Sequence, residues 1–253
     1  MRNKAVLFSL FCAGIYLAGA VHAETVYSTP VGFQRINLEE GRNFVGVSLR
    51  QDSPTLISVL GTNQLPTGTT VSVSTTLDIW NQDEQALTNR YWASSAPGFE
   101  GWSVSPSFAA ANSLPLDTDK GLILTIRSGE GTQELILSGN VTIGTQDKVL
   151  FENGYTLVAS MFPAEVDLDQ SGLITSGFIG GFSLAQSDNL IFYNHATDQF
   201  DDKIWYDSVG GVWRHADASL ATRKLQAGES FLIRRRNRGA AMTWSHPLPY
   251  TLP

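Results

Sequence analysis

Short runs of β-branched and aromatic residues follow one another along the chain, separated by clusters of Gly, Asn, Asp and Ser. Long apolar patterns with the 3.6-residue period of a helix are scarce. Short apolar runs between turn residues are typical of strands in an all-β domain, so we expect an all-β fold. The clearest expected strands span residues 44–49, 69–77, 121–127, 134–141 and 231–235.

Turn residues between several runs predict β-hairpins. In residues 121–138 the runs GLILTIR and TQELILS flank SGEG, and in residues 231–245 the runs FLIRR and AAMTWS flank RNRG. Glycine between two strand-like runs is a hairpin signal. The aromatic stretches YWASSAPGFEGW (91–102) and WYDSVGGVW (205–213) predict two more hairpins.

The second half of the chain repeats the pattern of the first, which predicts a tandem duplication of a small β-sandwich or barrel-like module. The copies are expected at residues 24–141 and 142–253, as two small domains or as one body. Matched residues lie 113 positions apart early in the copies and 107 apart near their ends, as changes in loop length would produce. The matches are Gly41 with Gly154, Trp80-Asn81 with Tyr193-Asn194, Tyr91-Trp92 with Trp205-Tyr206, Gly101-Trp102 with Val212-Trp213, and Gly121 with Gly228.

The first 23 residues have the layout of a secretory signal peptide. Arg2 and Lys4 precede the apolar stretch 5–20, and a cleavage site follows Ala23. That stretch is short for a bilayer span, and no later one is long enough, so we expect no membrane span in the mature chain. The protein is therefore expected to be bacterial, and secreted or periplasmic.

Cleavage would remove the only cysteine and two of the cations. Cys12 lies in the apolar stretch, so the mature protein would have no disulfide and would depend on its core for stability. Loss of Arg2 and Lys4 leaves 15 Lys and Arg against 24 Asp and Glu, which changes the formal charge from −7 to −9. This acidic balance argues against nucleic acid as a partner.

The order of these motifs resembles a module of exported bacterial proteins. The chain has an opening of the type GRNFVGVSL, then an aromatic-Asn segment, a hairpin that ends in Trp, and a closing strand pair. The pattern resembles the module that often begins Gly-Trp-Asn-Leu-Ile-Ser, and it is similar to a family of exported proteins of unknown function from the Planctomycetes–Verrucomicrobia group. The similarity covers about residues 26–248. It implies secretion and a β-fold, and it brings no catalytic residues.

Aromatic side chains are the candidate ligand contacts. Neighbouring rings in a strand point to opposite faces, so one ring of a pair packs in the core and the other meets a second layer, a neighbouring copy or a ligand. Trp102 and Trp213, which match between the copies, are expected to be core residues. The candidate ligand-binding residues are Trp80, Trp92, Tyr193, Trp205 and Tyr206.

One stretch has part of a calcium-loop pattern. In DLDQSGLI (167–174), Asp167, Asp169 and Ser171 occupy the first, third and fifth positions of an EF-hand-like loop, but Phe178 stands where the bidentate acid belongs. The alternative is a turn that leads into a short helix or strand. Calcium is thus the only cofactor that the sequence suggests.

Other polar residues have weaker patterns. The three histidines that remain after cleavage are expected at the surface, because none has the spacing of zinc ligands. The basic run at 234–239 is expected to protect an edge strand, with docking of a polyanion as the alternative. Acidic residues near position 200 would suit a glycosidase only at a suitable separation. The remaining histidines are His195, His215 and His246, and the acids are Asp198, Asp201, Asp202 and Asp207.

The pattern therefore favours a protein without catalytic activity. We expect an exported structural or interaction protein, whose partner is a glycan or another extracellular protein. The alternative is a carbohydrate-binding protein with exposed aromatic residues, and a weaker one is a secreted hydrolase. No nucleophile elbow, zinc-protease pair or phosphate-binding glycine loop occurs in the chain.

Overall fold

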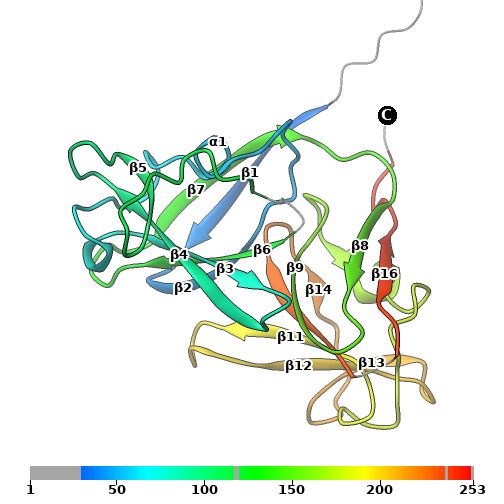
Figure 1. Cartoon of the computed structure of the whole chain (residues 1–253). Coiled ribbons are helices and arrows are strands. Elements are labelled where there is room, and N and C mark those ends of the chain that lie inside the picture. Colours follow the sequence, from blue (N-terminus) through cyan, green and yellow to red (C-terminus); the bar gives the residue numbers. More distant parts are fainter. Residues whose placement is uncertain (1–29, 117–119, 237–238, 252–253) are drawn as a thin grey trace, which may run out of the picture.

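The computed structural model describes residues 30–116, 120–236 and 239–251, and in these residues the fold is all-β, as predicted. Five antiparallel sheets contain nearly all the regular structure (Figure 1). No helix of the described ranges is long and apolar enough to cross a membrane. The predicted signal peptide, residues 1–23, lies outside the described residues.

The first half of the chain forms a five-stranded sheet and a two-stranded ribbon. The sheet has the order β2-β6-β3-β4-β5, and the ribbon pairs β1 with β7. A short helix and a 3-10 helix lie between β2 and β3. The elements are β1 (Val31–Leu38), β2 (Gly41–Gly46), α1 (Leu56–Leu60), η1 (Val71–Val73), β3 (Thr76–Asn81), β4 (Ala86–Ser94), β5 (Gly101–Val104), β6 (Gly121–Ile126) and β7 (Gln133–Asn140).

The second half has the same plan. Its five-stranded sheet has the order β9-β15-β11-β12-β13, and its ribbon pairs β8 with β16. A short additional ladder joins β10 to β14. The elements are β8 (Gln146–Leu150), β9 (Gly154–Ala159), β10 (Val166–Asp167), η2 (Leu168–Gln170), β11 (Asn189–Asn194), β12 (Gln199–Asp207), β13 (Val212–His215), β14 (Lys224–Leu225), β15 (Ser230–Arg235) and β16 (Met242–His246).

Equivalent strands therefore succeed one another in the same spatial order in the two sheets, as a duplication predicts. The strand registers also align the halves residue by residue. Trp92 lies opposite Thr76, and Trp205 lies opposite Asn189, so Trp92 is equivalent to Trp205. The sequence match of Tyr91-Trp92 with Trp205-Tyr206 was one residue out of register. In the same way, the register places Gly121 with Ser230 rather than with Gly228.

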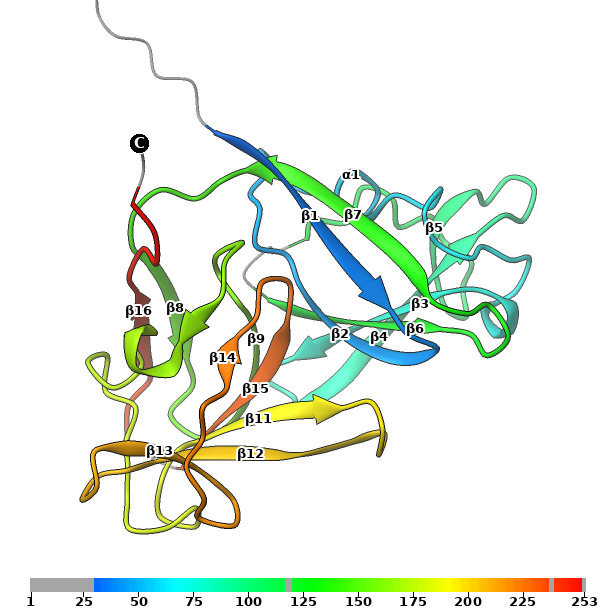
Figure 2. The same ribbon diagram turned by 180° about the vertical axis from the view of Figure 1, so that it is seen from behind.

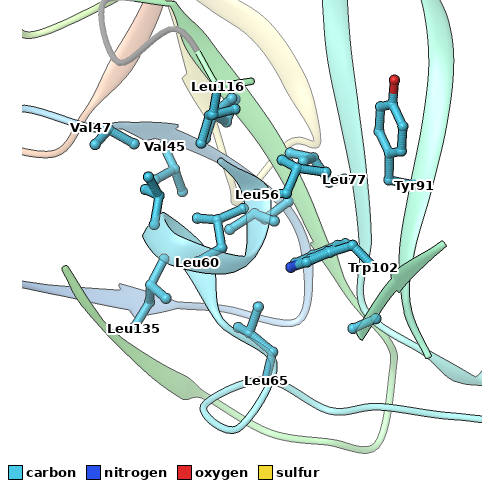
Figure 3. Packing of buried hydrophobic residues seen from close by; sticks show 14 of the residues in the cluster. Val45, Val47, Leu56, Leu60, Leu65, Leu77, Tyr91, Trp102, Leu116 and Leu135 are labelled. Atoms are coloured by element: carbon cyan, nitrogen blue, oxygen red, sulfur yellow. The ribbon is translucent and has the colours of Figure 1, made fainter. Parts of the chain in front are cut away.

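Each half packs its ribbon across one face of its sheet, which we call the inner face. In the first half, leucines of β6 and β7 meet α1 and Trp102 in one core (Figure 3). The capping box of α1, in which Thr55 and Ser58 bond each other's backbone N–H groups, positions this helix. The second half has a matching core that contains Trp213 and Trp244. The expectation that Trp102 and Trp213 are buried is confirmed.

The opposite, outer faces of the two sheets pack against each other. Alternation along the strands separates the cores, since Leu122 and Leu124 face inward while Ile123 faces the other sheet. On the second sheet Leu157 and Leu232 complete this third core. Figure 2 shows β9 and β15 crossing beside β2 and β6. The molecule is thus a stack of ribbon, sheet, sheet and ribbon.

Small residues allow the two sheets to come into close contact where they cross. The paired residues Gly46 and Gly121 of the first sheet meet the equivalent pair Ala159 and Ser230 of the second. A Cβ on Gly121 would lie 2.6 Å from Leu157 Cγ, which is closer than real Cβ contacts. The crossing therefore requires glycine in the first sheet.

Backbone bridges at the crossing follow a two-fold pattern. Val45 bridges Glu229, and the equivalent of Val45, Val158, bridges Lys120, the equivalent of Glu229. Such reciprocal contacts are the pattern of a two-fold dimer interface. The two halves therefore meet as the subunits of a symmetric dimer would, within one chain.

Two predicted hairpins are wrong, in the same way in both halves. After β6 the chain crosses to the ribbon, so β7 pairs with β1 rather than with β6. Likewise β16 pairs with β8 rather than with β15. The predicted hairpins at 91–102 and 205–213 are confirmed as β4–β5 and β12–β13. Residues 69–77 are not one strand, because they form η1 and only the start of β3.

Removal of either core tryptophan should destabilise the protein strongly. Trp102→Ala and Trp213→Ala each leave a cavity, and a buried Trp-to-Ala change costs about 3–5 kcal/mol. Urea unfolding should show both midpoints well below that of the unmodified protein. Phe182→Ala, whose ring is 76 % exposed, should leave the midpoint nearly unchanged. Equal midpoints for all three variants would contradict the assignment of the two tryptophans to the cores.

A methyl group at the sheet crossing should also be costly. Gly121→Ala forces the sheets apart at Leu157, and we expect a loss of about 1–3 kcal/mol in the free energy of unfolding. The double variant Gly121→Ala/Leu157→Ala should lose less than the sum of the single losses, because it relieves the overlap. Ser230→Ala, at the equivalent position, serves as control and should be close to neutral. Additive losses would show that the crossing is not limited by this contact.

Candidate functional site

A groove of about 470 Å³ lies on the outer face of the second sheet, beyond the area that the first sheet covers. Its floor is a row of paired residues that crosses four strands, with Tyr155 on β9, Arg234 on β15, Asn189 on β11 and Trp205 on β12. Its volume is in the range of small-molecule sites, about 300–1,000 Å³.

One wall of the groove is the loop at residues 182–188, which polar contacts hold against the sheet. Asn189 Nδ2 donates to the carbonyls of Leu184 (3.0 Å) and Asp188 (3.0 Å). Arg236 Nε donates to Ser187 O at 2.9 Å, and another of its nitrogens donates to Leu184 O at 3.2 Å. These bonds fix the wall and present the exposed ring of Phe182 at the groove.

The opposite wall is a turn that both halves contain in the same conformation. Phe108 N bonds Val104 O in the first half, and Ala218 N bonds His215 O in the second. Phe108 and Ala218 both have positive φ, 58° and 67°. The register of the neighbouring bonds makes these two residues equivalent.

The side chain at this turn decides whether the groove exists. In the first half the ring of Phe108 lies edge-on to Trp92, with 5.6 Å between centroids, and Trp92 is fully buried. In the second half Ala218 leaves the space over Trp205 open, and both residues line the groove. Trp205 Nε1 donates to His215 O at 3.0 Å, which fixes its indole in the floor. The second half thus has a space for a ring where the first half supplies its own.

Of the five aromatic residues proposed as ligand contacts, the structure places only Trp205 in this groove. Trp92 is covered by Phe108, and Tyr206 packs on Trp213 with 5.2 Å between centroids. Trp80 and Tyr193 lie at the junction of the two sheets. Trp80 Nε1 donates to Tyr155 O at 3.3 Å, and the Tyr193 ring lies 4.5 Å from that of Phe44. Trp80 also borders a second hollow between the halves.

The expectation that the basic run protects an edge strand is wrong. β15 lies inside the second sheet, between β11 and β9, so its arginines have other tasks. Arg234 faces the groove, whereas Arg235 is buried, bonds Phe151 O at 3.2 Å and lies 3.7 Å from the carboxylate of Asp188.

The DLDQSGLI stretch forms a turn around η2. Ser171 is buried and donates its hydroxyl to Leu168 O at 2.6 Å, so this oxygen already serves the turn. Asp167 lies 3.7 Å from the amine of Lys224. The described ranges contain no group of three His, Cys, Asp or Glu side chains that gather as metal ligands do. The geometry is that of the turn alternative.

The three histidines occupy different environments. His195 is exposed beside Tyr193, and His215 Nδ1 lies 3.3 Å from Asp202 Oδ1. The expectation of a surface position is wrong for His246, which is fully buried against Phe162. Burial lowers the pKa of His246, because the charged imidazolium loses its hydration.

A charged network near β14 is the second candidate site. The guanidinium of Arg223 bonds both Asp202 and Glu229, and it lies 3.9 Å from the centre of the Phe192 ring. Burial raises the pKa of Glu229, although Arg223 opposes the shift. A glycosidase needs an accessible acid and a second carboxylate with substrate between them. Here the arginine occupies that position, so the arrangement is that of an ion-pair network.

The remaining acids of this region serve local contacts. Asp198 accepts a hydrogen bond from the hydroxyl of Tyr193, and burial together with this carboxylate raises the pKa of Tyr193 to about 12. The pKa of Asp207 is lowered, first by a hydrogen bond from Gly210 N and then by Arg214. The pKa of Asp201 is lowered by Thr197. No pair of these acids has the raised and lowered pKa values of a catalytic dyad.

No protein-family model, curated protein or solved structure matches the chain. The groove must therefore be interpreted from its own geometry. Sequence reasoning missed Tyr155, Asn189, Phe182 and Ala218, which line it. Alignment of the two copies through the turn would have shown Phe108 replaced by Ala218.

The buried His246 should make the fold sensitive to mild acid. Its pKa is lowered from 6.5, so the unfolded chain binds the extra proton first as the pH falls. Stability is therefore complete above pH 6.5 and declines below it, with a slope of at most about 1.4 kcal/mol per pH unit. Urea unfolding between pH 7.5 and 5 should show this decline, and His246→Gln should lack it. The exposed His195→Gln control should follow the unmodified protein, and identical profiles for both variants would contradict the assignment.

Proposed function

We propose that the protein is an exported, non-enzymatic binding protein whose ligand is a glycan held in the groove of the second sheet. The observation that carries this proposal is the exchange of Phe108 for Ala218 at equivalent turns. The first half covers its tryptophan with its own ring, and the second half leaves a ring-sized space over Trp205. A sugar ring combines an apolar face with hydroxyl groups, and it is therefore suited to this space.

The lining supports a saccharide rather than a purely apolar ligand. Aromatic and aliphatic surfaces of Trp205, Ile191 and Phe182 lie beside the polar groups of Tyr155 and Asn189. Small-molecule sites combine a mainly apolar lining with a few fixed polar groups. The groove lies on a rigid sheet between a bonded loop and a bonded turn, so binding would require little ordering of the protein.

A structural or protein-binding role is the alternative, and exposed apolar side chains favour it. Val31 and Phe33 project from β1, at 65 % and 78 % exposure, and Ile136 lies on the neighbouring β7. This surface belongs to the first half, so it can be tested separately from the groove. The two halves would then have different tasks.

The decisive variant is Ala218→Phe, which rebuilds the first half's arrangement in the second. A phenylalanine already occupies this left-handed position in the equivalent turn, so the fold should accept it. The ring should cover Trp205 and abolish binding in a screen of neutral and acidic oligosaccharides by calorimetry. Unchanged affinity in this variant would remove the groove as the site.

Two exposed phenylalanines provide matched controls for this experiment. Phe182 lines the groove and Phe33 lies on the first half, with 76 % and 78 % exposure. Phe182→Ala should weaken glycan binding severalfold, while Phe33→Ala should leave it unchanged. The opposite result would favour the β1 surface as the interaction site.

A further inference from the structure

The charges that line the groove differ in sign from the protein as a whole. The chain has a formal charge of −7, yet the groove is lined by Lys203, Arg234 and Arg236 and by no Asp or Glu. Asp217, next to the lining residue Ala218, directs its carboxylate to Ser219. A local cationic site on an acidic protein concentrates anions there while the rest of the surface repels them.

Comparison of the halves shows how Lys203 came to have no acid partner. Its equivalent in the first half is Arg90, whose Nε lies 2.8 Å from the carboxylate of the cross-strand residue Asp78. In the second half the cross-strand residue is Ile191. Within the described ranges, Lys203 has no carboxylate within ion-pair distance. The cation is retained at this position, and the carboxylate that neutralises it in the first half is absent.

Arg234 provides a second cation in the same groove. Its guanidinium carbon lies 5.5 Å from the centre of the Tyr155 ring, and no carboxylate of the described part of the chain lies within 4 Å of it. Its equivalent in the first half is the neutral Thr125. Arg234 and Lys203 lie on strands that flank β11, about 12 Å apart between Cα atoms from strand spacings. Their long side chains can therefore reach a ligand from both sides of the floor.

We infer that the ligand of this groove is an acidic glycan, whose carboxylate or sulfate groups bind Arg234 and Lys203 while a sugar ring lies over Trp205. This inference rests on the proposed function and adds the ligand's charge to it. Arginine binds carboxylate and sulfate in a planar, two-bond geometry, and lysine adds a point charge. The ligand supplies the negative charge that Asp78 supplies in the first half.

The test compares acidic and neutral glycans on the full mature chain. The probes are oligogalacturonate for carboxylate, dextran sulfate for sulfate, and dextran as the neutral glycan. Arg234→Gln and Lys203→Gln should each weaken binding of the acidic probe about tenfold, since each removes a charged hydrogen bond. Lys224→Gln is the matched control, because it changes the charge equally on β14, away from the groove. Urea midpoints confirm that each variant folds.

The outcomes separate this inference from the proposed function. Acidic binding that Arg234→Gln, Lys203→Gln and Ala218→Phe weaken, and Lys224→Gln does not, supports both, and the stronger acidic probe identifies the anionic group. Equal binding of dextran, insensitive to the two groove cations but blocked by Ala218→Phe, overturns the acidic ligand and keeps the glycan site. A loss with Lys224→Gln as large as with the groove variants shows non-specific attraction and overturns the inference. Absence of glycan binding overturns both.

Discussion

The close crossing of the two five-stranded sheets determines the rest of the architecture. Gly46 and Gly121 have no side chains, so the backbone of β2 and β6 can approach Ala159 and Ser230. Around this contact Ile123, Leu157 and Leu232 exclude water from the outer faces. Each sheet consequently has two buried faces, one against its ribbon and one against its neighbour. A larger residue at the crossing would separate the sheets and hydrate that third core.

The reciprocity of the crossing explains how two similar halves came to do different work. In a two-fold arrangement, each surface has an equivalent on the other half. A single exchange at one of the two equivalent positions then creates a site once. Ala218 in place of Phe108, and Ile191 in place of Asp78, both lie on the outer face of the second sheet. The first half keeps these positions filled and neutralised, which is the arrangement of a structural unit.

Patterns of short runs and turns were sufficient to predict the all-β fold and the repeated plan, but not the pairing of strands. A turn between two runs predicts a hairpin only if both strands belong to one layer. The burial of β6 differs from that of β7, since β6 is buried on both faces and β7 alternates. A strand buried on both faces is typical of the middle of a covered sheet, and an alternating strand is typical of an outer layer. That difference was present in GLILTIR and QELILSGN, and it separates the layers.

The candidate site was less predictable, because it depends on contacts between distant segments. Trp205 was among the proposed residues, and the basic run at Arg234 was recognised, but nothing in the sequence placed them in one row. The row is created by pairing of β15 between β9 and β11, which brings together residues 34 to 79 positions apart in the chain.

Coverage by the first sheet then decides which part of the second sheet's outer face is available. The row of Leu157, Leu232 and Ile191 lies in the junction, whereas the adjacent row of Tyr155, Arg234, Asn189 and Trp205 lies just outside it. Adjacent same-face rows are only two residues apart along each strand, about 7 Å. The edge of the first sheet therefore falls between an apolar row and a polar one. The same packing that buries one row leaves the next open as a groove, so the site is a consequence of how the halves meet.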